Sequence, residues 1–347
     1  MSSSSALPYA IEMTLVNRTQ KLNNGLEIPL LQLGTWELGE KTADAVYEAL
    51  KSGYRGIDCA SIYMNETAVG KGIKRFIDET QTPRSDLFIL SKLYNNSHRK
   101  EDVEKALDVT LSDLGLEYLD AYIVHWPASF KPSADNRAWI PQDEQGVIIN
   151  DDVPYRETWE AMENLLQTGK VRSIGVSNLT MDQLEDVLSY ARVKPALLQV
   201  EIHPRLPQDK LVGFAQSQGI VVEGYSPFGN ANALYGQENQ LLQDPVLVEI
   251  AAKHGVSAAT VITNWVVNRG IVTLPRSSNP QHIRANTQQI ALDGEDTRKL
   301  QLLASHTRYC DLSELCGEVF FADEKTPEQI QYQSKESVRQ RAISAQS

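Results

Sequence analysis

Short runs of Val, Ile and Leu alternate with segments of helical spacing along most of the chain. Eight runs occur, in "LLQLGTW", "YRGIDCA", "LFILSKL", "LDAYIVHWP", "VRSIGVSN", "ALLQVEIHP", "GIVVEGYSP" and "GIVTLPRS". Runs that are apolar on both faces are typical of parallel strands covered by helices. Seven segments of helical spacing are "TADAVYEALKSG", "ETAVGKGIKRFIDE", "KEDVEKALDVTLSDLG", "YRETWEAMENLLQTGK", "TMDQLEDVLSYAR", "PQDKLVGFAQSQG" and "SAATVITNWVVNRG". Eight strand–helix units within ~260 residues predict an α/β fold, the (β/α)8 or TIM barrel.

A doubly wound parallel sheet is the competing architecture. That fold would carry a glycine-rich phosphate fingerprint after its first strand. Neither "GLEIPLLQLGTWELGE" nor "GKGIKR" matches such a fingerprint. The barrel is therefore favoured. Before its first strand, Asn-Gly in "TQKLNNGLEIPLLQLG" predicts an N-terminal β-hairpin.

We expect residues 1–347 to form a single domain, with the hairpin-capped barrel over residues 20–304 and a C-terminal extension after it. Two inserts interrupt the alternation, at residues 128–151 and 229–243. The extension, residues 305–347, is predicted to form a specificity loop and a polar tail, because loops that follow barrel strands carry specificity. The last ~20 residues are polar, which predicts a mobile end.

Charge and composition exclude several classes of protein. The net charge of −12 argues against a nucleic-acid surface. No run reaches the ~18 apolar residues of a membrane span, and the N-terminal stretch lacks the basic flank of a secretory signal. Three unevenly spaced cysteines do not predict a disulfide framework. We expect a cytoplasmic protein that binds neither membrane nor nucleic acid.

Polar residues end almost every predicted strand. A barrel brings such residues together on one face. Four of them suggest a proton relay: a nearby ammonium lowers the high pKa of a tyrosine, and a carboxylate keeps that ammonium charged. Tyr63, Lys92 and Asp58 supply these groups, and His125 could orient a carbonyl. A metal hydrolase is the less favoured interpretation of His125, His203 and Asp58, because the chain contains no H-x-H or H-E-x-x-H. No metal is predicted.

The chain resembles the aldo-keto reductase superfamily. The segments "GIDCASIYMNE", "SKL", "IVHWP", "GVSN", "LLQVEIHP", "GYSPFG" and "LPRSSNP" are similar to its successive signatures and cover roughly residues 20 to 320. The resemblance implies a nicotinamide-dependent oxidoreductase that reduces aldehydes or ketones to alcohols. It places Asp58, Tyr63, Lys92 and His125 at the catalytic positions, with Tyr63 as the general acid.

The resemblance also implies the residues of a cofactor site. The matching residues are Gly34, Thr35, Ser177, Asn178, Gln199, Tyr225, Ser226, Pro227, Arg276, Ser277, Ser278, Asn279, His282 and Asn286. Arg276 stands in place of the family's usual lysine, His282 in place of an arginine and Ala285 in place of a glutamate. A guanidinium still binds a phosphate. NADPH (NADP+) is therefore the expected cofactor, and NADH is possible.

Four aromatic residues match positions that line the substrate pocket in the family: Trp36, Tyr94, Trp126 and Phe130. Filling the core is the less favoured alternative for each of them. Two further departures are Met64, where a glycine is usual and which could narrow the pocket rim, and Cys59, where a threonine or serine is common.

Sugar aldehydes, uronates, α-keto lactones and aromatic aldehydes stay open as substrates. A monomer or homodimer is expected. The alternative function is a cofactor-binding regulatory or redox-sensing subunit that keeps the fold but scarcely turns over.

Overall fold

The computed structural model describes residues 14–229 and 240–346, and its centre is one parallel sheet of eight strands in the order β10-β9-β8-β7-β6-β5-β4-β3. Their bounds are β3 (Gln32–Gly34), β4 (Gly56–Asp58), β5 (Phe88–Leu93), β6 (Ala121–Val124), β7 (Ile174–Ser177), β8 (Leu197–Glu201), β9 (Val221–Tyr225) and β10 (Val272–Thr273). A parallel bridge between Leu31 and Thr273 brings the two edges together. The predicted (β/α)8 barrel is confirmed, and all eight predicted runs contain its strands.

The predicted N-terminal hairpin is confirmed as well. β1 (Thr19–Lys21) pairs antiparallel with β2 (Glu27–Pro29). In the turn between them, Asn23 Nδ2 donates to the carbonyl of Pro195 at 2.9 Å, and Asn24 Nδ2 donates to that of Arg172 at 3.0 Å. Because these carbonyls lie just before β8 and β7, the hairpin covers the amino ends of the strands.

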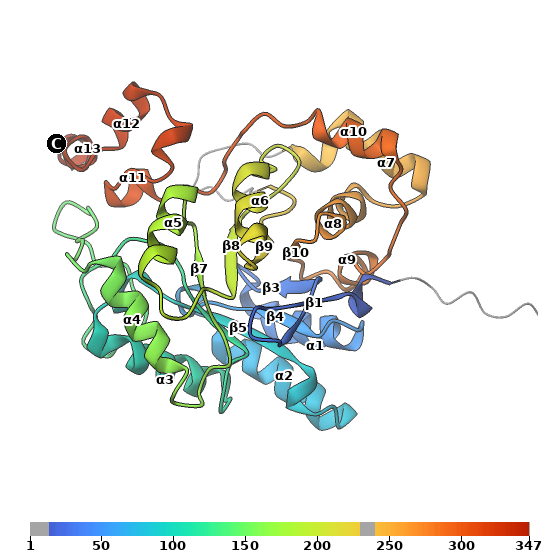
Figure 1. Ribbon diagram of the computed structural model, residues 1–347, viewed down its shortest axis with the longest axis horizontal. Coiled ribbons are helices and arrows are strands. Elements are labelled where there is room, and N and C mark those ends of the chain that lie inside the picture. The colour runs from blue at the N-terminus through green and yellow to red at the C-terminus, as the bar shows by residue number, and fades with distance from the viewer. Residues whose placement is uncertain (1–13, 230–239, 347) are drawn as a thin grey trace, which may run out of the picture.

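Each of the seven segments with helical spacing contains a helix. These are α1 (Thr42–Lys51), α2 (Glu66–Thr80), α3 (Lys100–Leu114), α4 (Tyr155–Leu165), α5 (Met181–Tyr190), α6 (Asp209–Ser217) and α8 (Ala258–Asn268), and they surround the sheet (Figure 1). In α1 the side chains of Ala45, Val46 and Ala49 are buried, which is the stripe that a helix presents to a sheet. α5 begins with a capping box between Thr180 and Gln183.

Six further helices were not predicted from the sequence. They are α7 (Pro245–His254), α9 (Pro280–Ala285), α10 (Gly294–Gln301), α11 (Ser313–Cys316), α12 (Pro327–Gln333) and α13 (Lys335–Gln346). Thr326 and Gln329 form a capping box at the start of α12, with Pro327 in its first turn. The last ~20 residues, expected to be a mobile end, are therefore largely helical in the structure.

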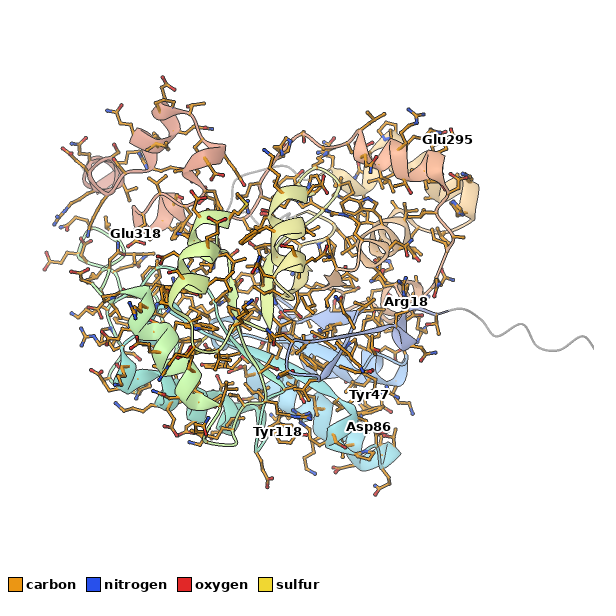
Figure 2. The ribbon with its side chains drawn as sticks, in the orientation of Figure 1. Arg18, Tyr47, Asp86, Tyr118, Glu295 and Glu318 are labelled. Atoms are coloured by element: carbon orange, nitrogen blue, oxygen red, sulfur yellow. The ribbon has the colours of Figure 1, made fainter. Side chains whose placement is uncertain are left out.

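The C-terminal helices α11 to α13 gather on one side of the molecule, away from α1 and α2 (Figure 1). Figure 2 shows Glu318, which follows α11, on the opposite side from Asp86 and Tyr118, which precede β5 and β6 in the chain. The extension thus lies away from the amino ends of these strands. The insert 128–151 is described throughout, whereas most of the insert 229–243 and the N-terminal stretch 1–13 lie outside the described residues.

Buried apolar side chains form one large cluster between the sheet and its helices, and a second, smaller cluster outside the barrel core. The smaller cluster unites the insert 128–151 with the C-terminal extension, through residues such as Tyr94, Trp126, Phe130 and Phe320. Within residues 14–229 and 240–346, no single helix is long and apolar enough to cross a membrane. Only α7 and α8 together meet that criterion, and an 89° bend separates them.

Candidate active site

Lys92 lies at the centre of the predicted relay and is fully buried. From β5 its Nζ reaches both carboxylate oxygens of Asp58, at 2.7 and 2.8 Å, and the carbonyl of Cys59 at 2.7 Å. Nζ also donates to the hydroxyl oxygen of Tyr63 at 3.3 Å. Asp58 ends β4, the strand next to β5, so the pairing of two neighbouring strands brings the carboxylate and the ammonium together.

The Lys92 ammonium keeps its charge in spite of its burial. Burial by itself would lower the pKa of Lys92, but the Asp58 carboxylate and Tyr63 raise it, and the net direction is upward. The ammonium donates to the oxygen of Tyr63. The phenol therefore accepts this bond and keeps its own proton for a partner elsewhere.

Tyr63 differs in one respect from the sequence argument, which expected its pKa to be lowered. Burial raises the pKa of Tyr63 to about 12, and the opposing effect of the Lys92 ammonium does not cancel that increase. The cation was visible in the sequence, whereas the loss of water around the buried ring was not. Tyr63 is consequently a neutral phenol at physiological pH, which is the protonation state required of a proton donor.

The backbone around Tyr63 holds the ring at the edge of the cavity. Tyr63 ends the short 3-10 helix η3 (Ser61–Tyr63), and its N–H donates to the carbonyl of Ala60 at 3.0 Å. Trp36 meets the ring edge to face with centroids 4.9 Å apart. The next residue, Met64, has a positive φ of 56° and a side chain that is 76% exposed. Met64 does not line the cavity, so the expectation that it narrows the pocket rim is not met.

His125 follows β6 and lies beside Tyr63, with ring centroids 5.9 Å apart. Burial lowers the pKa of His125 well below its ordinary value, and the Lys92 ammonium adds to that effect. The imidazole is therefore neutral. Its Nδ1 is buried without a hydrogen-bond partner among the described residues. A neutral imidazole can donate one hydrogen bond to a carbonyl oxygen without carrying a charge.

Amide and hydroxyl groups from three further strands lie beside the relay. Ser177 Oγ donates to the carbonyl of Gln199 at 2.8 Å. Asn178, with a φ of 60°, donates from Nδ2 to the carbonyl of His125 at 2.9 Å and accepts at Oδ1 from the Tyr225 hydroxyl at 2.7 Å. Gln199 Nε2 donates to Asp58 Oδ2 at 2.8 Å. These bonds tie the ends of β7, β8 and β9 to one another and, through Gln199, to the Asp58 carboxylate.

All of these groups border one cavity of about 700 Å³. Among its lining residues are Gly34, Thr35, Trp36, Asp58, Tyr63, Tyr94, His125, Trp126, Ser177, Asn178, Gln199, Tyr225, Ser226, Pro227 and Arg276, all of which the sequence predicted. Lys92 lies directly beneath it, bonded to Asp58 and Tyr63. The four proposed catalytic residues are thus brought together.

Other predicted cofactor residues do not line this cavity. Ser277, Ser278, Asn279 and His282 lie beyond Arg276, and Asn279 caps α9 through a bond to the N–H of Gln281. Asn286 is buried at the C-terminal end of α9. Their contacts with a cofactor stay predictions. Arg276 is exposed, and its Nη1 pairs with the Glu37 carboxylate at 3.1 Å.

The substrate side of the cavity contains residues that the sequence analysis missed. Phe130 does not line it but packs edge to face on Tyr94, with centroids 6.1 Å apart. The missed lining residues include Ile62, Gln142, Val147, Ile148, Val338 and Arg341, while Leu312 and Leu315 line the cavity from the segment expected to be the specificity loop. Phe320, in the aromatic segment "GEVFFADE", packs on Trp126 at 5.3 Å. The aromatic content of this segment was the available signal in the sequence. Only the folded chain shows that the segment supports the cavity wall at Trp126.

Comparison with known proteins agrees with this geometry. Residues 30–304 match the model of the aldo/keto reductase family. The chain belongs to the aldo-keto reductase family. It is 46% identical over 301 residues to the NAD(P)H-dependent D-xylose reductase of Pachysolen tannophilus, covering 84% of this chain and 94% of that protein. It is 42% identical over 295 residues to aldo-keto reductase family 1 member A1 of Mus musculus, with 83% and 90% covered.

A solved structure extends the likeness to three dimensions. The aldose reductase of Schistosoma japonicum superposes on this reductase with a TM-score of 0.80 and 36% sequence identity, over 88% of this chain and 98% of that one. The protein is accordingly an NAD(P)H-dependent oxidoreductase of the carbonyl-reducing family.

Proposed function

We propose that this aldo-keto reductase reduces aldehyde and ketone carbonyls to alcohols with NADPH, and that Tyr63 is the general acid. The hydrogen bond from Lys92 to the Tyr63 oxygen carries the proposal. Because that oxygen accepts from the ammonium, its proton is available to a carbonyl oxygen in the cavity. As the proton leaves, the adjacent ammonium stabilises the phenolate, and Asp58 balances the charge of the ammonium.

The residues around the relay fit a nicotinamide carboxamide. Gln199 Nε2 is occupied by acidic partners, and no described residue donates to Gln199 Oε1. Ser177 and Asn178 add a hydroxyl and a second amide. We propose that these three hold the carboxamide, that Tyr225 stacks on the ring, and that Arg276 binds a phosphate of the adenosine end. The bound cofactor supplies the hydride.

The substrate class follows from the cavity wall. Trp36, Tyr94, Trp126 and the apolar residues of the insert and the extension provide a largely apolar surface above Tyr63 and His125. Such a wall excludes water and accommodates carbonyl compounds with apolar bodies. We propose that residues 305–321 act as the specificity loop, since Leu312 and Leu315 line the cavity from this segment.

Replacing Tyr63 with Phe tests the proposed acid. The variant keeps the ring against Trp36 but lacks the proton, so carbonyl reduction should fall by roughly 10²–10⁴-fold. Binding of NADPH, followed by fluorescence titration, should change less than about threefold. Reduction at the parental rate would exclude Tyr63 as the acid. Tight NADPH binding by the parental protein without multiple turnover would instead favour the regulatory subunit.

A further inference from the structure

A second buried carboxylate lies inside the barrel, beside the relay. Glu223 of β9 has no exposed surface. Its Oε2 accepts from Gln199 Nε2 at 3.0 Å, and its Oε1 accepts from Gln32 Nε2 at 3.1 Å. Gln32 reaches it from β3 across Gly56, where a Cβ would come within 2.3 Å of the glutamine side chain. The barrel interior therefore holds an acid between two amides.

Gln199 connects this acid with the catalytic carboxylate. A carboxamide nitrogen has two hydrogens. Those of Gln199 are directed at Asp58 Oδ2, at 2.8 Å, and at Glu223 Oε2, at 3.0 Å. With both hydrogens occupied, the rotation of the amide is fixed. Gln199 Oε1 is then the polar atom left for the cavity that the residue lines.

Within the described part of the chain, no cation forms an ion pair with Glu223. The charged side chains that act on it are Asp58 on β4 and Lys92 on β5, and Lys92 is already bound to Asp58. The neighbouring strands contribute uncharged residues, Gln199 from β8 and Val272 opposite it on β10, and β3 contributes the uncharged Gln32. Burial, with repulsion from Asp58, raises the pKa of Glu223 to about 8. The group can thus change its charge within the range in which an enzyme works.

Gln32 allows both protonation states. An ionised Glu223 accepts from the Gln32 amide nitrogen. A protonated Glu223 can donate to the Gln32 amide oxygen after the amide turns over, and Gln32 Oε1 has no other partner among the described residues. Gln199 can keep both of its bonds in either state. The proton on Glu223 therefore changes the charge beneath the relay without displacing the Gln199 amide.

We propose that Glu223 is a positioning residue of the reductase site, which fixes the Gln199 amide for the cofactor and tunes the Asp58–Lys92–Tyr63 relay through its own charge. This inference rests on the proposed function. An ionised Glu223 adds a negative charge near the ammonium and so opposes formation of the Tyr63 phenolate. Carbonyl reduction is then faster while Glu223 is protonated and declines as it ionises.

Three variants separate the charge from the hydrogen bond. Glu223→Gln keeps an acceptor for Gln199 and gains a donor for Gln32 but cannot ionise. Glu223→Leu removes the acceptor. Glu66→Gln is the matched control, because Glu66 is also a buried glutamate with a pKa raised by burial to about 7 and its charge also acts on Lys92, yet its oxygens accept from Ser91 and Thr110 and not from Gln199. For each protein, kcat with saturating NADPH and the Kd of NADPH are measured between about pH 6 and about pH 10.

The parental enzyme and Glu66→Gln should lose several-fold in kcat as the pH rises through the pKa of Glu223, whereas Glu223→Gln should not. Glu223→Leu should bind NADPH about tenfold more weakly at every pH. An unchanged alkaline decline in Glu223→Gln, or an equal change in both glutamine variants, would overturn the tuning role. Parental NADPH affinity in Glu223→Leu would overturn the positioning role. If the parental protein reduced no carbonyl, the proposed function would fail, and the affinities would still decide the positioning role.

Discussion

The relay and the outer wall of the cavity are held in place by different means. Asp58 and Lys92 lie on adjacent strands, are almost fully buried, and are joined by two bonds shorter than 3 Å. The outer wall consists of the insert 128–151 and the extension after residue 304, which pack on one another in a separate apolar cluster. Under the proposed function, reaction chemistry belongs to the sheet, whereas substrate choice belongs to segments that depend on tertiary contacts.

One carboxylate at the end of β8 connects the two regions. Glu201 is fully buried, and its oxygens accept from the backbone N–H groups of Tyr309 and Cys310, both at 2.8 Å. His203 Nε2 lies 2.9 Å from the same carboxylate. The extension is therefore anchored to the barrel by backbone bonds that do not depend on its side chains. The outer wall can vary in sequence while its attachment is preserved.

The largest effect is expected from Lys92→Met. This change leaves Asp58 buried beside an apolar side chain, which should lower the free energy of unfolding by roughly 3–5 kcal/mol at neutral pH. It also removes the cation that supports Tyr63, so kcat should fall at least about 100-fold. Denaturant unfolding and steady-state kinetics measure the two effects.

A second variant tests the cause of that loss. The double change Asp58→Asn with Lys92→Met removes both charges, and it should be more stable than Lys92→Met alone because no unpaired carboxylate remains. Parental stability in Lys92→Met would show that the pairing of Lys92 with Asp58 does not stabilise the fold.

Glu201→Ala should act on the outer wall and largely spare the relay. It leaves two buried N–H groups of the extension without acceptors, at a cost of about 1–3 kcal/mol each. KM for bulky aldehydes should rise several-fold, with a smaller change in kcat. Hydrogen exchange at the amides of Tyr309 and Cys310 should become faster. The control is Glu201→Gln, which retains one acceptor oxygen. Its exchange rates and KM should lie between those of the parental protein and those of Glu201→Ala. Slow exchange at both amides in Glu201→Ala would show that the anchor lies elsewhere.

The smallest effect is expected from Met64→Gly, which lies beside the relay but outside it. The positive φ of Met64 strains a residue with a Cβ, so glycine should raise the free energy of unfolding by about 1 kcal/mol or less, since glycine also gains freedom in the unfolded chain. Met64→Ala keeps the strain and should give no increase. Because the Met64 side chain is exposed and does not line the cavity, kcat should stay parental in both variants.

The sequence predicted the residues that depend on one strand and its end. Asp58, Lys92, His125 and Gln199 could be assigned because the end of a parallel strand points to one known face of a barrel. The upward pKa of Tyr63 could not be predicted, since it depends on how much water its surroundings exclude. The wall residues Gln142, Val147 and Arg341 were also missed, because no strand register determines where long segments pack.

Glu223 shows, within a single strand, the same difference between what the sequence predicts and what only the structure reveals. A glutamate inside the apolar run "GIVVEGYSP" was visible in the sequence. Its meaning depends on which neighbours face it, and Gln32 lies 191 positions away in the chain. Local sequence pattern determined the barrel, through its periodicity, and the hairpin, through its Asn-Gly turn, together with the chemical character of the strand ends. Hydrogen bonding between neighbouring strands leaves little choice in how such segments pair. Only the tertiary structure decided the charge states, the buried Glu223 and the outer wall, because desolvation and long-range packing depend on every element at once.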